Sequence, residues 1–418
     1  MTITASGKDR IGSIVRTCRL LGRMNKARPS DVIYYELLGD YYERLARARE
    51  RGELVAAHTI FFPHEILLAM DMVPMHCEFT AWMIALFSGD VGDLLTAAAE
   101  RRLAPEICSA HRLLTGALHS GVLPRADIVA WADIVCDSSY KSGLHLREYH
   151  QCPGYMVDIP FQQSEHEDRY YADEMKELVR FLEEHSGRRL NEDRLGEIMS
   201  VADRQIRLFR EIDDLRKTVP SPLPPQEFIK LMTADCLFSG MPRAIDYLTA
   251  LRDDLAVKVK AGEGWANPER FRIMTIGFPP LRLFAAIDRV SQGYGAVSVS
   301  DPFILEWEEG RLDAPTPLEN AAKKVSMHPV MCSWGPLDHR VTDRLVKSAK
   351  EHKVDGAIMY QQMGCGQLGG VSRFMKEVLA EIDVPMLQIN MDIVDTTVAG
   401  EDDIRQELER FYEFLADR

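Results

Sequence analysis

Apolar positions along this chain recur with more than one spacing, and the spacing changes from region to region. Near the start, the residues Tyr34, Leu37, Leu38, Tyr41 and Leu45 follow one another at intervals of three and four. This spacing forms one face of a helix, so we expect helical structure over residues 1 to about 50. Later in the chain, short apolar runs with β-branched residues replace the helical stripe, which is typical of buried strands.

Two such runs predict the first α/β layer. They are DIVAWADIV at 127–135 and GYMVDIP at 154–160, and each lies between charged or proline-containing breaks. The segment from Ser138 to Gln151 between them is the expected crossover helix of a parallel unit. Upstream, Pro63 comes just before EILLAMD, which predicts that a strand or loop leads into a short helix there.

The sequence pattern in the middle of the chain predicts helices. Met175, Leu178, Val179 and Leu182 form a stripe that stops at Gly187. A second helix is expected after Asn191, because asparagine is a favoured N-cap and two acidic residues follow it in the first turn. The proline-rich stretch 219–228 predicts a break within this region.

Alternation of strand and helix patterns returns from Arg272. We expect strands at RIMTIG, AVSV, DGAIMY and PMLQIN. Helices are predicted at 281–293, where Gly293 is the expected end, and at 368–382. A last helix places Ile404, Leu408, Phe411 and Leu415 on one face, where they can cover a sheet.

These elements predict an α/β fold with two doubly wound parallel-sheet domains. The length of 418 residues agrees, because one core stops growing well before that size. The expected organisation is an N-terminal helical segment at 1–50, a first α/β domain at 51–165 with Cys108 and Cys136, a helical region at 166–265, and a second α/β domain at 266–418 with Cys365.

Charge and hydropathy exclude two classes of binding partner. The formal net charge is -14, so no positive excess exists to attract the phosphates of nucleic acid. No apolar run approaches the roughly 20 residues that cross a bilayer, and the first ten residues lack the apolar core of a signal peptide. We therefore expect a cytoplasmic protein that binds neither nucleic acid nor membrane.

Cysteines are the most informative candidates for chemistry. Ligands collect beyond the carboxyl ends of strands in open α/β sheets, and Cys136 and Cys365 both follow predicted strands. Cys108 opens another helical stretch, whose first amides favour a thiolate. Gly364 and Gly366 beside Cys365 let the backbone approach a bulky ligand, and the alternative explanation is a tight strand-to-helix turn. A lone cysteine is often only a small buried apolar side chain, so placement leaves both interpretations open.

Local motifs do not settle the choice. The chain has no CxxC pair, no Walker loop and no HExxH. Spacing is no guide either, because Cys136 lies 28 residues after Cys108 and Cys365 lies 229 residues after Cys136. Any metal site must be assembled by the fold.

The order of longer segments is more specific. These segments are TIFFPHEILLAMDMVP, EICSAHRLLTGAL, ADIVAWADIVCDSSYK, CPGYMVDIPFQ, NEDRL, GFPPLRLFAAIDRV, VDGAIMYQQMGCGQ and VPMLQINMDIVD. In that order they resemble the 2-hydroxyacyl-CoA dehydratase and benzoyl-CoA reductase subunit family, of the 2-hydroxyglutaryl-CoA dehydratase D-component type. The resemblance runs from about His58 to the C-terminus.

The resemblance implies a subunit that holds one [4Fe-4S] cluster through three cysteines, with the fourth iron position left to water or substrate. By motif match, the three ligands fall on Cys108, Cys136 and Cys365. An iron left open in this way suits a Lewis-acid role. His111, three residues after Cys108, is the candidate for moving protons at the site. Cys332 lies where family members often have a cysteine and is a candidate neighbour of the cluster.

Partners follow from the same resemblance. In the family, an ATP-hydrolysing activator protein with its own cluster delivers an electron at very low potential to paired catalytic subunits. The electron passes to an acyl-CoA thioester and makes a ketyl-type radical. We therefore expect an acyl-CoA substrate, an activator, and a dimer formed with a paralogous second subunit or a second copy. Dehydratase is the first choice because dehydratases dominate the family, and benzoyl-CoA reductase is the second.

Three other interpretations stay open. One is a homodimeric relative that carries a double-cubane cluster and reduces small molecules; about eight irons per chain instead of about four would identify it. Another is a cluster-free structural partner subunit. The last is a zinc or thiol protein outside the family, which would contain no iron.

Overall fold

The computed structural model describes residues 9–134, 136–160, 164–334 and 339–418, without the side chains of residues 165 and 332–334. Its strands are β1 (Val55–His58), β2 (Val73–His76), β3 (Ile128–Ala132), β4 (Gly154–Val157), β5 (Phe271–Gly277), β6 (Ala296–Ser300), β7 (Gly356–Gln362) and β8 (Met386–Met391). Its helices are α1 (Arg10–Met24), α2 (Pro29–Arg47), α3 (Glu65–Ala69), α4 (Cys77–Phe87), α5 (Gly92–Glu100), α6 (Ser109–His119), α7 (Asp137–His150), α8 (Glu165–Ser186), α9 (Glu192–Arg216), α10 (Glu227–Phe238), α11 (Pro242–Ala261), α12 (Phe284–Tyr294), α13 (Pro317–Ser326), α14 (Pro329–Trp334), α15 (His339–Glu351), α16 (Gly366–Glu381) and α17 (Glu401–Ala416).

The strands form two four-stranded sheets that share one strand order. The first sheet runs β2-β1-β3-β4 and the second runs β6-β5-β7-β8, and neighbouring strands are parallel throughout. We call the first sheet with α3–α7 the first α/β unit, and the second sheet with α12 and α15–α17 the second α/β unit. This architecture confirms the predicted α/β class with two parallel sheets.

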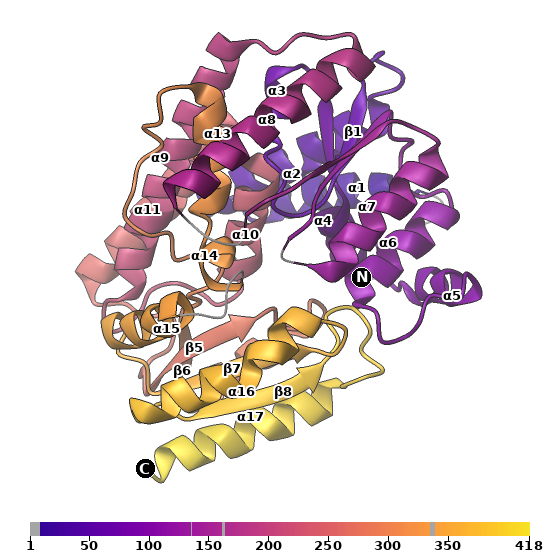
Figure 1. Ribbon diagram of the computed structural model, residues 1–418. Helices are drawn as coiled ribbons and strands as arrows, with labels where there is room; N and C mark the ends of the chain where they lie inside the picture. Colours follow the sequence, from indigo (N-terminus) through magenta and orange to yellow (C-terminus); the bar gives the residue numbers. More distant parts are fainter. Residues whose placement is uncertain (1–8, 135, 161–163, 335–338) are drawn as a thin grey trace.

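Helices surround both sheets and join the two units (Figure 1). The long helices α8, α9 and α11 lie between the units in the chain, and α9 packs on α3 and α11. Asn191 caps α9 as expected, because its Oδ1 accepts a hydrogen bond from the Arg194 amide. One large cluster of buried apolar side chains extends through the first unit and these helices to the second unit.

A separate apolar cluster lies in the second unit. It includes the predicted face of α17, with Ile404, Leu408, Phe411 and Leu415 buried beside side chains of β5, β7 and β8. The last helix therefore covers the second sheet, as its sequence pattern predicts.

The end of α12 differs from the sequence prediction. The helix continues past Gly293 to Tyr294, and Gly295 has φ 70°, a left-handed conformation. A residue with a side chain is strained in that conformation, so the second glycine, and not the first, ends the helix.

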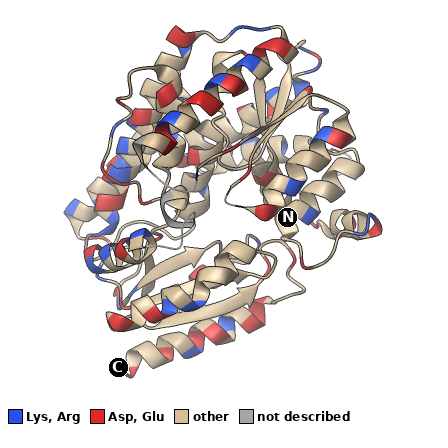
Figure 2. Cartoon of the chain, in the orientation of Figure 1, with Lys and Arg blue, Asp and Glu red and all other residues tan. Residues whose placement is uncertain are grey.

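Charged residues lie mainly on the outer helices, and acidic residues with a few interspersed basic residues occur along α17 (Figure 2). The strands are mostly uncharged, as expected for sheets with helices on both faces. Among the described helices, none has the length and apolar composition of a membrane span.

Candidate metal centre

Three cysteines occupy the same kind of position in the fold, because each is the residue that caps the start of a helix. Cys108 precedes α6, Cys136 precedes α7 and Cys365 precedes α16. The first turn of a helix has amide groups without partners inside the helix, and they attract negative charge. Each of the three cysteines therefore lies at the N-terminal end of a helix.

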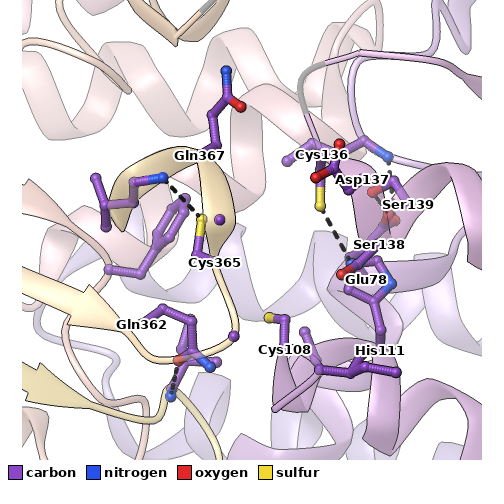
Figure 3. A pocket seen from close by; sticks show the side chains of 18 of the residues that line it. Glu78, Cys108, His111, Cys136, Asp137, Ser138, Ser139, Gln362, Cys365 and Gln367 are labelled. Carbon is purple, nitrogen blue, oxygen red and sulfur yellow. Dashed lines mark hydrogen bonds between the residues drawn. The ribbon is translucent and has the colours of Figure 1, made fainter. Parts of the chain in front are cut away.

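The three cysteines line one cavity of about 280 Å³. Cys108 and Cys136 come from the first α/β unit, and Cys365 comes from the second. In Figure 3 the three sulfur atoms border the same open space, with His111, Glu78 and Gln362 around it. Residues that are 229 positions apart in the chain therefore face one another in the fold.

A glycine makes this approach possible. A Cβ atom placed on Gly364 would lie 2.2 Å from the Cys108 amide nitrogen and 2.5 Å from its Cα. No side chain fits there, so the loop before α16 rests directly on the backbone of Cys108. Gly366 also lines the cavity, and the nearest atom to a Cβ there is an Asp137 oxygen at 3.9 Å.

Burial raises the pKa of all three thiols, and that of Cys365 rises to about 11. Backbone amides oppose the rise: those of Ala110, of Ser138 and Ser139, and of Gln367 and Leu368 each lower the pKa of the neighbouring thiol. The Leu368 amide donates to the Cys365 sulfur at 3.4 Å. The protein supplies hydrogen bonds for ionised sulfurs, and a bound cation would supply the missing positive charge.

His111 lies against one of the thiols. Its Nε2 is 3.7 Å from the Cys136 sulfur, and its Nδ1 is 2.8 Å from the Ser142 hydroxyl. Burial lowers the pKa of His111, so its ring is neutral. If Ser142 donates to Nδ1, then Nε2 carries the proton and donates to the sulfur. Such a contact orients a ligating sulfur and tunes its charge.

A buried carboxylate also faces the cavity. Glu78 is 4% exposed, and its Oε1 accepts a hydrogen bond from the Ser139 hydroxyl at 2.6 Å. Its Oε2 accepts from the Ile60 amide at 3.2 Å and lies 3.5 Å from His76 Nδ1. These contacts fix the carboxylate at the edge of the space between the thiols.

An ion pair locks the two units together beside the cavity. Arg112 on α6 reaches Asp392 at 3.2 Å and Asp395 at 3.4 Å, both beyond β8. Asp392 is buried and also accepts a hydrogen bond from Gln362, which lines the cavity. An acidic strand end is usually a solvated turn, yet here it holds the second unit to the helix that follows Cys108.

The donor set fits an iron-sulfur cluster. Thiolates are the preferred ligands of such clusters, and three of them from separate segments leave one metal position free. Two further observations fit a ligand bound between the thiols. Gly364 lets the loop before α16 approach the backbone of Cys108, and the Ser109 hydroxyl beside Cys108 is buried without a partner among the described residues.

Several known proteins are similar to this chain in sequence. The family described as 2-hydroxyglutaryl-CoA dehydratase, D-component, matches residues 59–415. The chain belongs to this family. Its relatives include the (R)-2-hydroxyisocaproyl-CoA dehydratase alpha subunit of Clostridioides difficile, 21% identical over 86% of this chain and 89% of that protein. A subunit of benzoyl-CoA reductase from Thauera aromatica is 23% identical over 91% of this chain and 93% of that protein.

A third relative is the (R)-phenyllactyl-CoA dehydratase alpha subunit of Clostridium sporogenes, 22% identical over 55% of this chain and 59% of that protein. Family membership confirms the resemblance inferred from the sequence. It also makes the chain part of an enzyme of the dehydratase or reductase type, because the named relatives are subunits of such enzymes.

For this member of the D-component family, the structure brings most of the predicted site residues together. Cys108, Cys136, Cys365, Gly364, Gly366 and His111 all line the cavity. The roles assigned to them, ligation and proton transfer, stay predictions. The side chain of Cys332 lies outside the described residues. Cys18, Cys77, Cys152 and Cys236 are not among the residues that line this cavity.

Glu78, Gln362 and Arg112 are the site residues that the sequence did not single out. Glu78 follows a strand of only four residues, which gives too short a pattern to mark a strand end. Arg112 and Asp392 are 280 positions apart, and no local pattern connects them.

Proposed function

We propose that this chain is the iron-sulfur subunit of an acyl-CoA dehydratase or aryl-CoA reductase, and that Cys108, Cys136 and Cys365 hold one [4Fe-4S] cluster. The observation that carries the proposal is that these cysteines, each at the start of a helix, line one cavity between two α/β units. When bound, the cluster would supply an open iron position and a low-potential electron for a thioester carbonyl.

The chain's own residues would hold the thiolates and move protons. Amides of α6, α7 and α16 hydrogen-bond to the sulfurs, and His111 can donate its Nε2 proton to Cys136. Glu78 places a buried carboxyl group at the edge of the cavity, where it accepts hydrogen bonds from Ser139 and Ile60. The remaining cavity wall is largely apolar and would exclude water from the reacting carbon.

We extend the proposal to partners. The relatives are named as subunits, two of them as alpha subunits, which supports pairing with a second subunit or a second copy. An ATP-dependent activator with its own cluster is the electron source that the family resemblance implies. The substrate is an acyl-CoA thioester, because the relatives are named for such substrates.

Anaerobic purification followed by iron and sulfide analysis and electron paramagnetic resonance tests the cluster. About four irons per chain are expected, and about eight would favour the double-cubane interpretation. The described lining residues of the cavity include three cysteines, which favours the smaller number.

Substitution of the ligands gives the sharper test. Cys108→Ser, Cys136→Ser and Cys365→Ser should each abolish the paramagnetic signal and lower the iron content. Cys152→Ser is the matched control, because Cys152 is a partly buried free cysteine that does not line the cavity. Full iron content in all three ligand variants would overturn the proposal. Product analysis with a 2-hydroxyacyl-CoA and with an aryl-CoA then separates dehydration from ring reduction.

A further inference from the structure

The wall of the cavity beyond the three thiols is made largely of apolar side chains. The aromatic members are Phe61 and Trp82 from the first α/β unit and Phe278 from the second. The aliphatic members come from both units and from α14: Ile60, Ile107, Val330, Leu368 and Ile393. A ligand that reaches the thiols therefore contacts aromatic and branched aliphatic groups, the usual lining of a site for an apolar ligand.

The aromatic residues are held in place by the fold. The rings of Trp82 and Phe278 lie 5.1 Å apart between centroids, so the two units meet at this wall as well. Phe61 lines the cavity with φ 64°, a left-handed conformation that is unfavourable for an aromatic residue. Such conformations persist where surrounding contacts enforce them, and they are common at binding sites.

The charges that line the cavity are mainly negative. Glu78, Glu106 and Asp137 contribute carboxylates, and Lys141 is the cation among the described lining residues. Glu78 is buried, whereas Lys141, Glu106 and Asp137 are exposed. Solvent screens the exposed charges, so the buried carboxylate dominates the interior of the cavity. A second carboxylate brought into this space would lose its hydration and be repelled.

We infer that the acyl group accepted here is uncharged and apolar, and that a dicarboxylic acyl thioester is excluded. The inference rests on the proposed function, since it names the acyl part of the same thioester. Phe61, Trp82 and Phe278 form the attractive surface. Glu78 is the repulsive element, and a specificity site commonly combines the two.

The test compares two thioesters of equal chain length, hexanoyl-CoA and adipoyl-CoA, which differ by a terminal methyl against a carboxylate. Their affinities for the anaerobically purified full chain, with its iron content measured, are obtained by calorimetry. Hexanoyl-CoA should bind roughly tenfold more tightly or better. Phenylacetyl-CoA, which adds a ring for the aromatic wall, should bind at least as well as hexanoyl-CoA.

Two carboxylate variants locate the effect. Glu78→Gln keeps the shape of the side chain and removes its charge, so the affinity ratio of the two thioesters should fall. Glu106→Gln is the control, because it removes an exposed carboxylate at the same cavity and should change the ratio less. If Glu78→Gln does not fold, the ratio for the unaltered chain decides alone.

Equal or tighter binding of adipoyl-CoA overturns the inference, and so does an unchanged ratio in the Glu78→Gln protein. These results leave the proposed function intact as long as iron is present and both thioesters bind. If the iron-loaded chain binds no acyl-CoA, the proposed function fails, and the inference fails with it.

Discussion

The two α/β units have the same strand order but contribute unequally to the centre. β3 and β7 hold the third place in their sheets, and each is followed by a cysteine that caps the next helix, Cys136 in one unit and Cys365 in the other. Among the described residues that line the cavity, the first unit adds another ligand candidate, Cys108, at the start of the helix that precedes its third strand.

Neither α/β unit alone can form the three-cysteine centre. A parallel sheet presents its ligands beyond the carboxyl end of a central strand, and both units use that position. One such position offers a single sulfur, whereas the proposed cluster needs three. The site is therefore a property of the interface, and changes that disturb the interface should act on metal binding before they act on either sheet.

The largest effect on metal binding is expected from Gly364→Ala. The added Cβ would overlap the backbone of Cys108, so the two units must separate, and overpacking of this kind typically costs about 1–3 kcal/mol of unfolding free energy. We expect iron binding to be lost. Gly370→Ala in the same segment is the control, because nothing lies within 4 Å of its Cβ position. Equal iron content in the two variants would show that the contact does not hold the centre together.

Arg112→Met tests the ion pair between the units. Asp392 is 3% exposed at its side chain and would lose its cationic partner, a change that typically costs about 3–5 kcal/mol. The urea midpoint should fall clearly. Arg373→Met is matched to it, because the Arg373–Glu377 pair on α16 is exposed and typically contributes less than about 1 kcal/mol. Similar midpoints for both variants would contradict a structural role for Arg112.

The sequence predicts the second sheet better than the first, for physical reasons. β5, β7 and β8 are six or seven residues long and give clear apolar runs, whereas β1 and β2 have four residues each, and β2 contains Pro74. The sequence does not predict helix α4 either, because most of its residues are buried and no polar face marks its period.

The centre itself was predicted only through family resemblance. Each cysteine alone is compatible with burial in a core, and the chain has no short spacing that signals a metal. What sequence patterns cannot supply is the juxtaposition of units: Gly364 against Cys108, or Arg112 against Asp392.

Each unit contains a buried acidic residue with a shifted pKa, and the two shifts have opposite directions. Asp288 in the second unit is the residue whose burial destabilises the fold. It lies on α12, and its Oδ2 has no hydrogen-bond partner among the described residues. Burial raises its pKa from 3.8 to about 7. Between these values the folded protein binds more protons than the unfolded chain, so stability falls as the pH rises from about 4 to about 7.

Asp288→Asn should remove this loss. At pH 8 the variant should melt higher than the unaltered protein, by a free energy on the order of 4 kcal/mol at most, and at pH 4 the two should melt alike. Melting temperatures across this pH range provide the measurement. A variant that melts lower at pH 8 would show that the carboxylate is ionised and has a partner.

Glu65 on α3, in the first unit, shows the opposite case and a somewhat smaller effect. Burial alone would raise its pKa, but Lys324 at 3.0 Å and the hydroxyl of Ser239 at 2.5 Å outweigh burial and lower the pKa to about 2. The unfolded chain binds the proton first, so this contribution is present above pH 4.5 and is lost as the pH falls toward 2. Glu65→Gln should cost on the order of 3 kcal/mol at pH 7 and flatten the acid limb of the stability profile.

Because Asp288→Asn flattens the limb between about pH 4 and 7 instead, the two variants should change opposite sides of one curve of stability against pH. A Glu65→Gln profile that keeps its full acid limb would mean that another buried carboxylate carries it.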